Sequence, residues 1–295
     1  MVQPKSASSY LYKGLVIFFL LLLTMLCLLP IVHTLATSFS SRAAVISGRV
    51  GLLPVGFSTI AYERILDDSM FIQSFKNSVV RVILGGSINL VLTILTAYPL
   101  SRSRERFPQR NIYMWYIVFS MLFAGGIIPS YLLIKNLGLL DTIWVLVLPG
   151  ALPIFNMLVL MNYFRGLPSE IEEAAVIDGA SAWVMMVKIM VPLAIPSIAT
   201  VTLFSIVNHW NAFFDGVIYI NSGTKKPLQT YLQSLVIDQS QFMNMTAEER
   251  QRLEELTSKN FNAAKLLVSM IPILAVYPFL QRFFVTGLVL GSVKS

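Results

Sequence analysis

The hydrophobic and polar positions of the chain fall into long apolar blocks separated by polar segments. Each block is close to the length of about 20 residues that a helix needs to cross the hydrocarbon core of a membrane. The six blocks cover roughly residues 14–37, 77–99, 112–134, 140–163, 192–214 and 265–288. This pattern predicts an all-α, polytopic membrane protein in which residues 1–295 form one transmembrane domain with six spans.

The composition supports this class, because a chain of 295 residues that is 56% hydrophobic and 13% charged is too apolar for a soluble fold of that size. The first block could instead belong to a signal peptide, since Lys5 and Lys13 precede it. Its apolar run continues past Cys27 and Pro30, however, which is longer than the roughly 7 to 15 residues of a signal-peptide core. We therefore interpret it as a transmembrane helix.

The positions of lysine and arginine predict how the spans are oriented, because these residues are retained on the cytoplasmic side. The segment 101–110 contains four arginines and one glutamate, and the N-terminal tail has lysines but no acid. We expect both termini and the loop 165–191 to be cytoplasmic, and the segments 38–76 and 215–264 to be extracellular. The net charge of +7 follows from this arrangement. The basic residues are not interleaved with aromatic residues that could stack on bases, so we do not expect nucleic-acid binding.

Residues for catalysis and metal binding are scarce. His33 and His209 are the only histidines, Cys27 is the only cysteine, and there is no HExxH or GxxxxGK[ST] motif. We therefore expect neither a metal site nor a phosphate-binding loop, and no enzymatic activity in this chain. A membrane hydrolase built on serine and aspartate alone stays open, although no spacing favours it. If the protein does work, a partner would have to supply the energy.

The segment EIEEAAVIDGASAWVMMVKIMVP, residues 170–192, gathers four of the 15 acidic residues within nine positions. Ser169 is predicted to cap a helix, with Glu172 as its capping-box partner, and Gly179 to allow a turn. Ala174 and Ala175 would form a smooth patch for close approach. A second helical piece would present Trp183, Met186 and Ile189 as an apolar stripe.

An interfacial helix on lipid headgroups is the alternative interpretation of this segment. An anionic cytoplasmic leaflet would repel the acidic first turn, so binding to the membrane surface explains only its second half. Pro192 then marks the start of the next span, where its missing N–H has little effect.

A spaced motif runs from residue 173 to residue 192. It consists of Glu173-Ala174-Ala175, three residues, Gly179, nine residues, Ile189, one residue and Val191-Pro192. It resembles the EAA loop of binding-protein-dependent ABC importer permeases, E-A-A-x3-G-x9-I-x-L-P, and departs from it only at Val191. Asp178, Ala180 and Ser181 resemble the carbohydrate-uptake branch, the maltose-type permeases with six spans. The similarity continues in GGIIPSYLLIKNLGLLDT, residues 125–142, and in the pair Trp210-Asn211.

The resemblance implies a permease of the bacterial plasma membrane for a carbohydrate, expected to be an oligosaccharide. Its loop would fold as a coupling helix that docks on a cytoplasmic ATPase, whose closure drives alternating access. The implied partners are two ATPase subunits that bind ATP and Mg²⁺, a second homologous permease, an extracellular solute-binding protein and membrane lipids. No cofactor is expected in this chain, and no nucleic acid. The implied coupling residues are Glu173, Ala174, Ala175, Asp178, Gly179, Ile189 and Pro192.

Polar side chains inside the fifth span are candidates for the transport pathway, because they are unfavourable in a membrane. These are Asn208, His209 and Asn211. Hydrogen bonding between helices is the alternative. Outside, residues 246–260 are predicted to form a charged helix, and residues 236–244 either enter the docked binding protein or form an ordinary surface loop.

An ion-coupled secondary transporter is the rival function. It would predict inverted repeats and an acidic residue buried within a span. The chain shows no clear repeat, and Asp215 lies only at the edge of a span. A structural scaffold would leave the EAA pattern unexplained.

Overall fold

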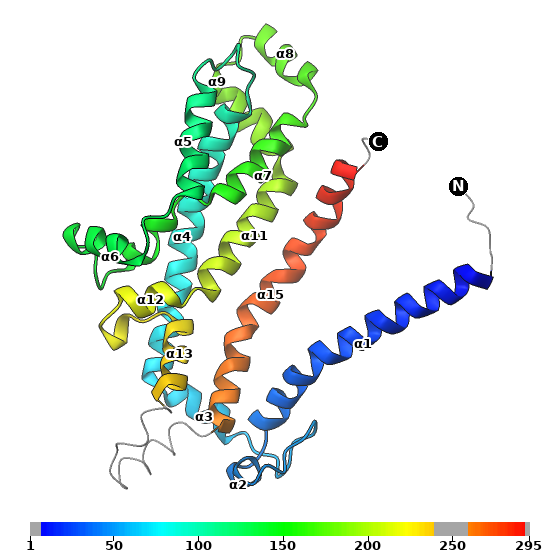
Figure 1. Ribbon diagram of the computed structural model, residues 1–295, viewed down its shortest axis with the longest axis vertical. Helices are drawn as coiled ribbons and strands as arrows, with labels where there is room; N and C mark the ends of the chain where they lie inside the picture. The colour runs from blue at the N-terminus through cyan, green and yellow to red at the C-terminus, as the bar shows by residue number, and fades with distance from the viewer. Residues whose placement is uncertain (1–6, 239–258, 293–295) are drawn as a thin grey trace. The chain divides into compact units, whose positions relative to one another are not determined.

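All regular secondary structure in the described part of the chain, residues 7–238 and 259–292 of a computed structural model, is helical (Figure 1). The all-α class predicted from the sequence is confirmed. The chain divides into two compact units, one of Met1–Ser69 with Leu235–Met270 and one of Met70–Ser234 with Ile271–Ser295. The second unit contains the EAA motif.

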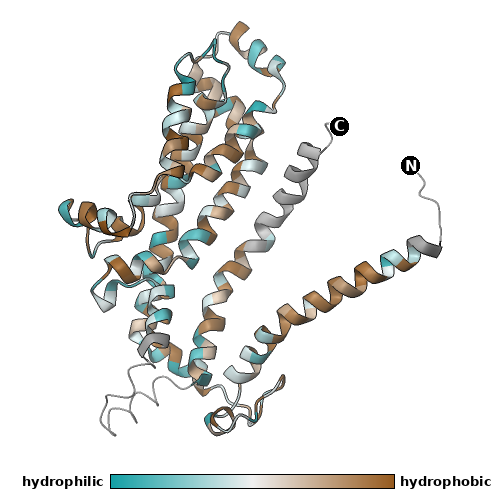
Figure 2. Cartoon of the chain, in the orientation of Figure 1, coloured by the Kyte–Doolittle hydropathy of each residue, from teal (hydrophilic) through white to brown (hydrophobic). Residues whose placement is uncertain are grey.

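The first unit begins with α1 (Ala7–Ser38), followed by the short helices α2 (Arg42–Ile46) and α3 (Ile60–Asp67). α1 contains the predicted range 14–37, and its side chains are exposed along most of its length. Figure 2 shows that hydrophobic residues follow one another along the middle of this helix. Exposure of so many leucine and phenylalanine side chains is unfavourable in water, so the helix suits a lipid or protein environment.

The second unit contains α4 (Ser69–Ser101), α5 (Arg110–Leu122) and α6 (Ile127–Asn136). We expected one helix over 112–134, but α5 and α6 meet at an angle of 112°. Gly126 has a φ of 86°, which a helix cannot accommodate and which glycine adopts readily. The chain therefore turns sharply at residues 123–126.

Two further pairs of helices are bent. The short 3₁₀ helices η1 (Ile143–Leu146) and η2 (Leu148–Gly150) join α7 (Ile154–Arg165) at 44°. This bend lies where the sequence has Pro149, Gly150 and Pro153. The helices of Ala182–Leu193 meet α11 (Ile195–Asn211) at 82°.

The described residues include three helices that are long and apolar enough to cross a membrane, or up to six spans if each bent pair counts as one. The third of these long helices lies in α15 (Lys259–Ser292). The six-span arrangement of a single transmembrane domain stays a prediction, because length and composition do not decide between these counts.

The segment after α11 forms α12 (Phe214–Tyr219), η4 (Gly223–Lys225) and α13 (Leu228–Asp238). Asp141, between α6 and η1, holds this segment in place with its carboxylate. The carboxylate accepts hydrogen bonds from the Ser222 hydroxyl at 2.6 Å, the Ser222 N–H at 2.9 Å and Lys225 Nζ at 2.9 Å. Most of the predicted charged helix 246–260 and of the loop 236–244 lies at residues 239–258, outside the described residues.

A hydrophobic core at one end of the second unit joins the end of α4 to α7, to α8 (Ser169–Ile177) and to the residues that follow α8. α8 lies at this end of the unit, at the top of Figure 1. Methionines are frequent in the core, and this unbranched side chain fills irregular gaps well. The buried residues are Ala97, Tyr98, Leu100, Met157, Leu160, Met161, Phe164, Ala175, Met185, Met186, Met190 and Ala194.

Candidate functional site

The EAA segment, defined here as residues 169–192, begins with α8. Ser169 is the first residue of this helix, and Pro168 occupies the capping position without a side-chain hydrogen bond. The predicted capping box of Ser169 and Glu172 is therefore wrong. Glu170 and Glu172 still lie in the first turn, where the helix dipole favours acidic side chains.

The end of α8 is a glycine-dependent turn, as the sequence suggested. Gly179 has a φ of 76°, its N–H bonds to the carbonyl of Val176 at 3.0 Å, and the N–H of Ala180 bonds to the carbonyl of Ala175 at 2.9 Å. This pair of bonds is the Schellman motif, which favours glycine at that position. Asp178 precedes the turn and is exposed.

The continuation of the EAA segment is a π-helix, η3 (Met185–Met190), between the short helices α9 (Ala182–Val184) and α10 (Val191–Leu193). Trp183 is 63% exposed, but Met186 is only 5% exposed and lies in the core. Ile189 packs against the same core. The predicted apolar stripe is therefore wrong, because a π-helix places residues three apart differently from an α-helix.

The two alanines of the motif face in different directions. Ala175 is buried in the core, whereas Ala174 is exposed, so they do not form one patch. The outer surface of α8 instead carries Glu173, Ala174, Val176 and Ile177, and Ile177 is 86% exposed. Val176 and Ile177 were not predicted from the sequence, although two apolar residues that follow the acidic first turn of a helix were the available signal.

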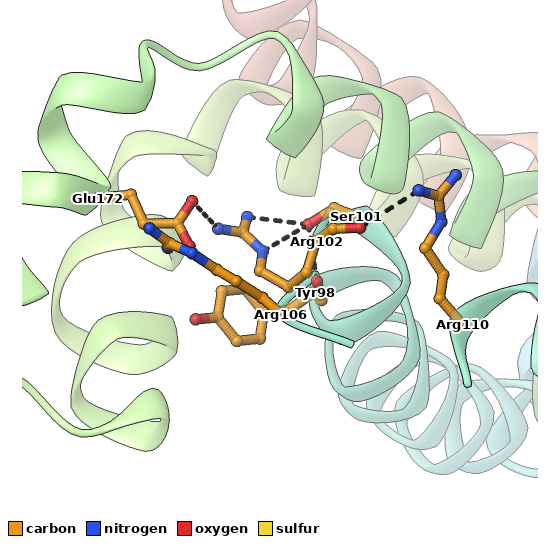
Figure 3. Close-up of polar contacts among 6 residues, drawn as sticks. All are labelled: Tyr98, Ser101, Arg102, Arg106, Arg110 and Glu172. Carbon is orange, nitrogen blue, oxygen red and sulfur yellow. Dashed lines mark hydrogen bonds and ion pairs between the residues drawn. The ribbon is translucent and has the colours of Figure 1, made fainter. Parts of the chain in front are cut away.

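Glu172 forms ion pairs with Arg102 and Arg106, which follow the end of α4 (Figure 3). The side chains of Arg102 and Glu172 are only 10% and 19% exposed. Arg102 also donates from Nε and Nη2 to Ser101 Oγ at 3.1 and 2.9 Å, and its Cζ lies 4.6 Å from the centre of the Tyr98 ring. From the sequence, these arginines were expected only to determine the orientation of the spans.

Two more arginines bind the carbonyl groups at the end of α4. Arg165, the last residue of α7, donates to the carbonyl of Leu100 at 3.0 Å. Arg110, the first residue of α5, donates to the carbonyl of Arg102 at 3.3 Å. Positive charge at a helix C-terminus is favourable, so these contacts fix the end of α4 from both neighbouring helices.

The candidate pathway residues do not converge. His209 is buried against α4, whereas Asn208 and Asn211 are exposed. A Cβ atom added to Gly85 would lie 2.5 Å from Cε1 and Nε2 of His209. Glycine at position 85 therefore permits α4 and α11 to approach closely at this point.

Asn89 completes the contact between α4 and α11. One orientation of its amide accepts a hydrogen bond from His209 Nε2 at 3.2 Å and donates to the carbonyls of Gly85, Gly150 and Ala151, each at 3.1 Å. His209 Nδ1 has no hydrogen-bond partner among the described residues. This geometry favours the helix-packing interpretation of His209, and a pathway role for Asn208 and Asn211 stays a prediction.

An ion pair with a buried arginine joins α4 to α12. Arg81 of α4 pairs with Asp215 of α12 and donates from Nη1 to the carbonyl of Ala212 at 3.2 Å. In addition, the amide of Asn156 in α7 donates to the Ser205 hydroxyl of α11 at 3.0 Å.

Within residues 7–238 and 259–292, no group of three or more His, Cys, Asp or Glu side chains could hold a metal ion.

The family described as "Binding-protein-dependent transport system inner membrane component" matches residues 89–290, which include the whole EAA segment. The chain is 38% identical to the "Polygalacturonan/rhamnogalacturonan transport system permease protein YtcP" of Bacillus subtilis, over 96% of this chain and 98% of that protein. It is 30% identical to the "Diacetylchitobiose uptake system permease protein NgcG" of Streptomyces coelicolor, over 89% and 83% of the two chains.

A solved structure is also similar. It is described as the crystal structure of "a bacterial ABC transporter involved in the import of the acidic polysaccharide alginate". One of its chains matches with a TM-score of 0.86 and 32% sequence identity, over 96% of this chain and 100% of that chain.

Proposed function

The chain belongs to the family of inner membrane components of binding-protein-dependent transport systems, and from this premise we propose how it works. It is a permease subunit of an ABC importer. Partner ATPases drive it between inward-open and outward-open states by acting on the EAA segment, and its substrate is an oligosaccharide.

The names of similar proteins support the choice of substrate. Polygalacturonan and rhamnogalacturonan, diacetylchitobiose and alginate are all built from more than one sugar unit. An oligosaccharide is therefore the substrate class to test first, with both acidic and neutral sugars in the set.

The exposed outer surface of α8 is the observation that carries the proposed coupling. Among the nine residues of α8, only Ala175 is buried, so the helix presents Glu173, Ala174, Val176 and Ile177 outward. An acidic side chain beside exposed apolar residues suits a protein surface with a pocket and a basic group. Asp178 and Gly179 form the turn behind this surface, and Ile189 and Pro192 continue the chain toward α11.

The partners are proposed on the same basis. They are two ATPase subunits, which bind ATP and Mg²⁺, a second related permease and an extracellular solute-binding protein. The family description supports the binding protein, and the arginines of residues 101–110 support a cytoplasmic position for the EAA segment and both termini.

The experiment compares wild type with Ile177→Asp. The assembled importer is purified through a tag on this chain, and the recovered ATP hydrolysis is measured. Ile177→Asp should lower the recovered hydrolysis about tenfold or more, because it buries an unpaired charge at the proposed contact. Ile46→Asp is the control, since Ile46 is 71% exposed on α2, outside the EAA segment.

Uptake in membrane vesicles tests the substrate and the energy source. Oligosaccharides of galacturonate and of alginate, together with diacetylchitobiose, are offered with and without ATP. Accumulation of at least one sugar should require ATP. Accumulation that follows a proton or sodium gradient without ATP would contradict the proposed function.

A further inference from the structure

The ion pair of Arg102 and Glu172 joins two segments that are 70 residues apart in the sequence. Glu172 lies on α8, and Arg102 directly follows α4, so the pair links the EAA segment to the end of a long apolar helix (Figure 3). α8 is otherwise connected through the chain at Pro168 and through the turn at Gly179. The pair is therefore a third attachment of α8 to the rest of the second unit.

The arginine side of this attachment is rigidly held. Ser101 Oγ accepts two hydrogen bonds from the Arg102 guanidinium, and the Tyr98 ring packs beneath it. Arg110 also holds the carbonyl of Arg102. A charge-assisted bond from a fixed, mostly buried guanidinium is stronger and more directional than a surface ion pair.

The helix side has few other restraints. Ala175 is the only buried residue of α8, and a methyl group contributes little to fixing the position of a helix. Besides Ala175, only Ile171 and Glu172 of α8 are half-buried, and Glu172 is the one of them that forms an ion pair with Arg102. Loss of the pair would leave α8 folded, since its turn and backbone hydrogen bonds do not depend on Glu172.

We propose that Arg102 and Glu172 are positioning residues that transmit movement of α8 to α4, in addition to the covalent route through η3 to α11. This inference rests on the proposed function, in which an ATPase moves α8. The two routes act on the same pair of helices, because α4 and α11 are in contact at Gly85, Asn89 and His209. A force on α8 would therefore shift both helices together.

The test is a double-mutant cycle with Glu172→Gln, Arg102→Met and the double variant. Glu172→Gln keeps the shape of the side chain, so folding is preserved. The assembled importer is placed in proteoliposomes, and the number of ATP molecules hydrolysed per sugar transported is measured. Glu170→Gln and Arg104→Met are the matched controls, because both residues are exposed on the same segments.

Each single variant should raise the ratio of ATP hydrolysed to sugar transported about fivefold or more, while the ATPase stays bound. The double variant should be no worse than Glu172→Gln, since that substitution already removes the ion pairs of Glu172 with both Arg102 and Arg106. The controls should stay within about twofold of wild type, which is less than the smallest coupling factor expected of an allosteric link.

An unchanged ratio in Glu172→Gln with the ATPase bound would overturn the inference. Loss of the ATPase from Glu172→Gln, but not from Glu170→Gln, would also overturn it, because Glu172 would then be a docking residue. Failure of the proposed function is distinguishable, since the wild-type importer itself would show no ATP-dependent uptake, and the inference would fall with it.

Discussion

Gly85 shows how strongly a single position can constrain two helices. Its missing side chain leaves the space that the His209 ring occupies, and the ring is fixed there by Asn89. The neighbouring Gly86 is different, because a Cβ atom there would meet nothing within 4 Å. Two adjacent glycines of one helix therefore differ in whether a side chain would fit, and the sequence alone does not reveal this difference.

Gly85→Ala should destabilise the protein by about 1–3 kcal/mol, because the new methyl group would overlap the His209 ring and force the helices apart. The measurement is thermal unfolding of the purified protein in detergent. Gly86→Ala is the matched control and should unfold at or above the wild-type temperature, since alanine favours a helix. Equal losses in both variants would contradict the close approach at Gly85.

The negative charge of Asp141 stabilises the segment that contains Ser222 and Lys225. The hydroxyl and N–H groups of Ser222, and then the Lys225 ammonium group, hold the pKa of the Asp141 carboxyl well below its usual value. Because the folded-state pKa is lower than the unfolded one, the stabilisation is complete above the ordinary aspartate pKa near 3.8. It is lost as the pH falls through the folded-state value.

Asp141→Asn should therefore lower stability by about 1–2 kcal/mol at pH 7. Asparagine tolerates the positive φ of 58° at this position, so the substitution changes mainly the charge. The difference from wild type, followed by thermal unfolding, should shrink as the pH falls below about 4. A difference that does not depend on pH would show that the charge is not the cause.

At the scale of helices, the two alanines of the EAA motif are expected to have different roles, one in packing the core and one in docking. Ala175 faces the core, so Ala175→Trp should destabilise the second unit by about 1–3 kcal/mol or more through overpacking. Ala174 is exposed, so Ala174→Trp should leave unfolding unchanged and instead block the proposed docking of the ATPase. Thermal unfolding and ATPase recovery together distinguish them, and identical behaviour of the two variants would refute the assignment of faces.

The apolar blocks predicted where most long helices lie, because burial in lipid requires apolar side chains over a fixed length. The bend at Gly126, the π-helix and the partner of Glu172 were not predictable. Helical periodicity assumes 3.6 residues per turn, so it misplaced Met186. Capping rules consider only neighbours in sequence, so they assigned Glu172 to Ser169 instead of Arg102. The turn at Gly179 was predictable, because few residues besides glycine accept its φ.

At the scale of the whole molecule, the six-span topology makes a labelling prediction. In a Cys27→Ala background, a cysteine at Ser103 should react with an impermeant reagent only from the cytoplasm. A cysteine at Thr224 should react only from outside, because the arginines of residues 101–110 are retained inside. Both positions are exposed. Reaction of the two cysteines from the same side would refute the six-span arrangement.

The π-helix makes the number of residues between the EAA motif and α11 as important as their identity. Each residue of an α-helix turns the chain by about 100° around the helix axis. The wide turn of η3 takes up about one residue more than an α-helix of the same length along the axis. Conversion of η3 to a regular α-helix with all its residues kept would therefore rotate the preceding segment, and α8 with it, by about that angle relative to α11. Glu172 would then point away from Arg102, although every side chain of the motif had been kept.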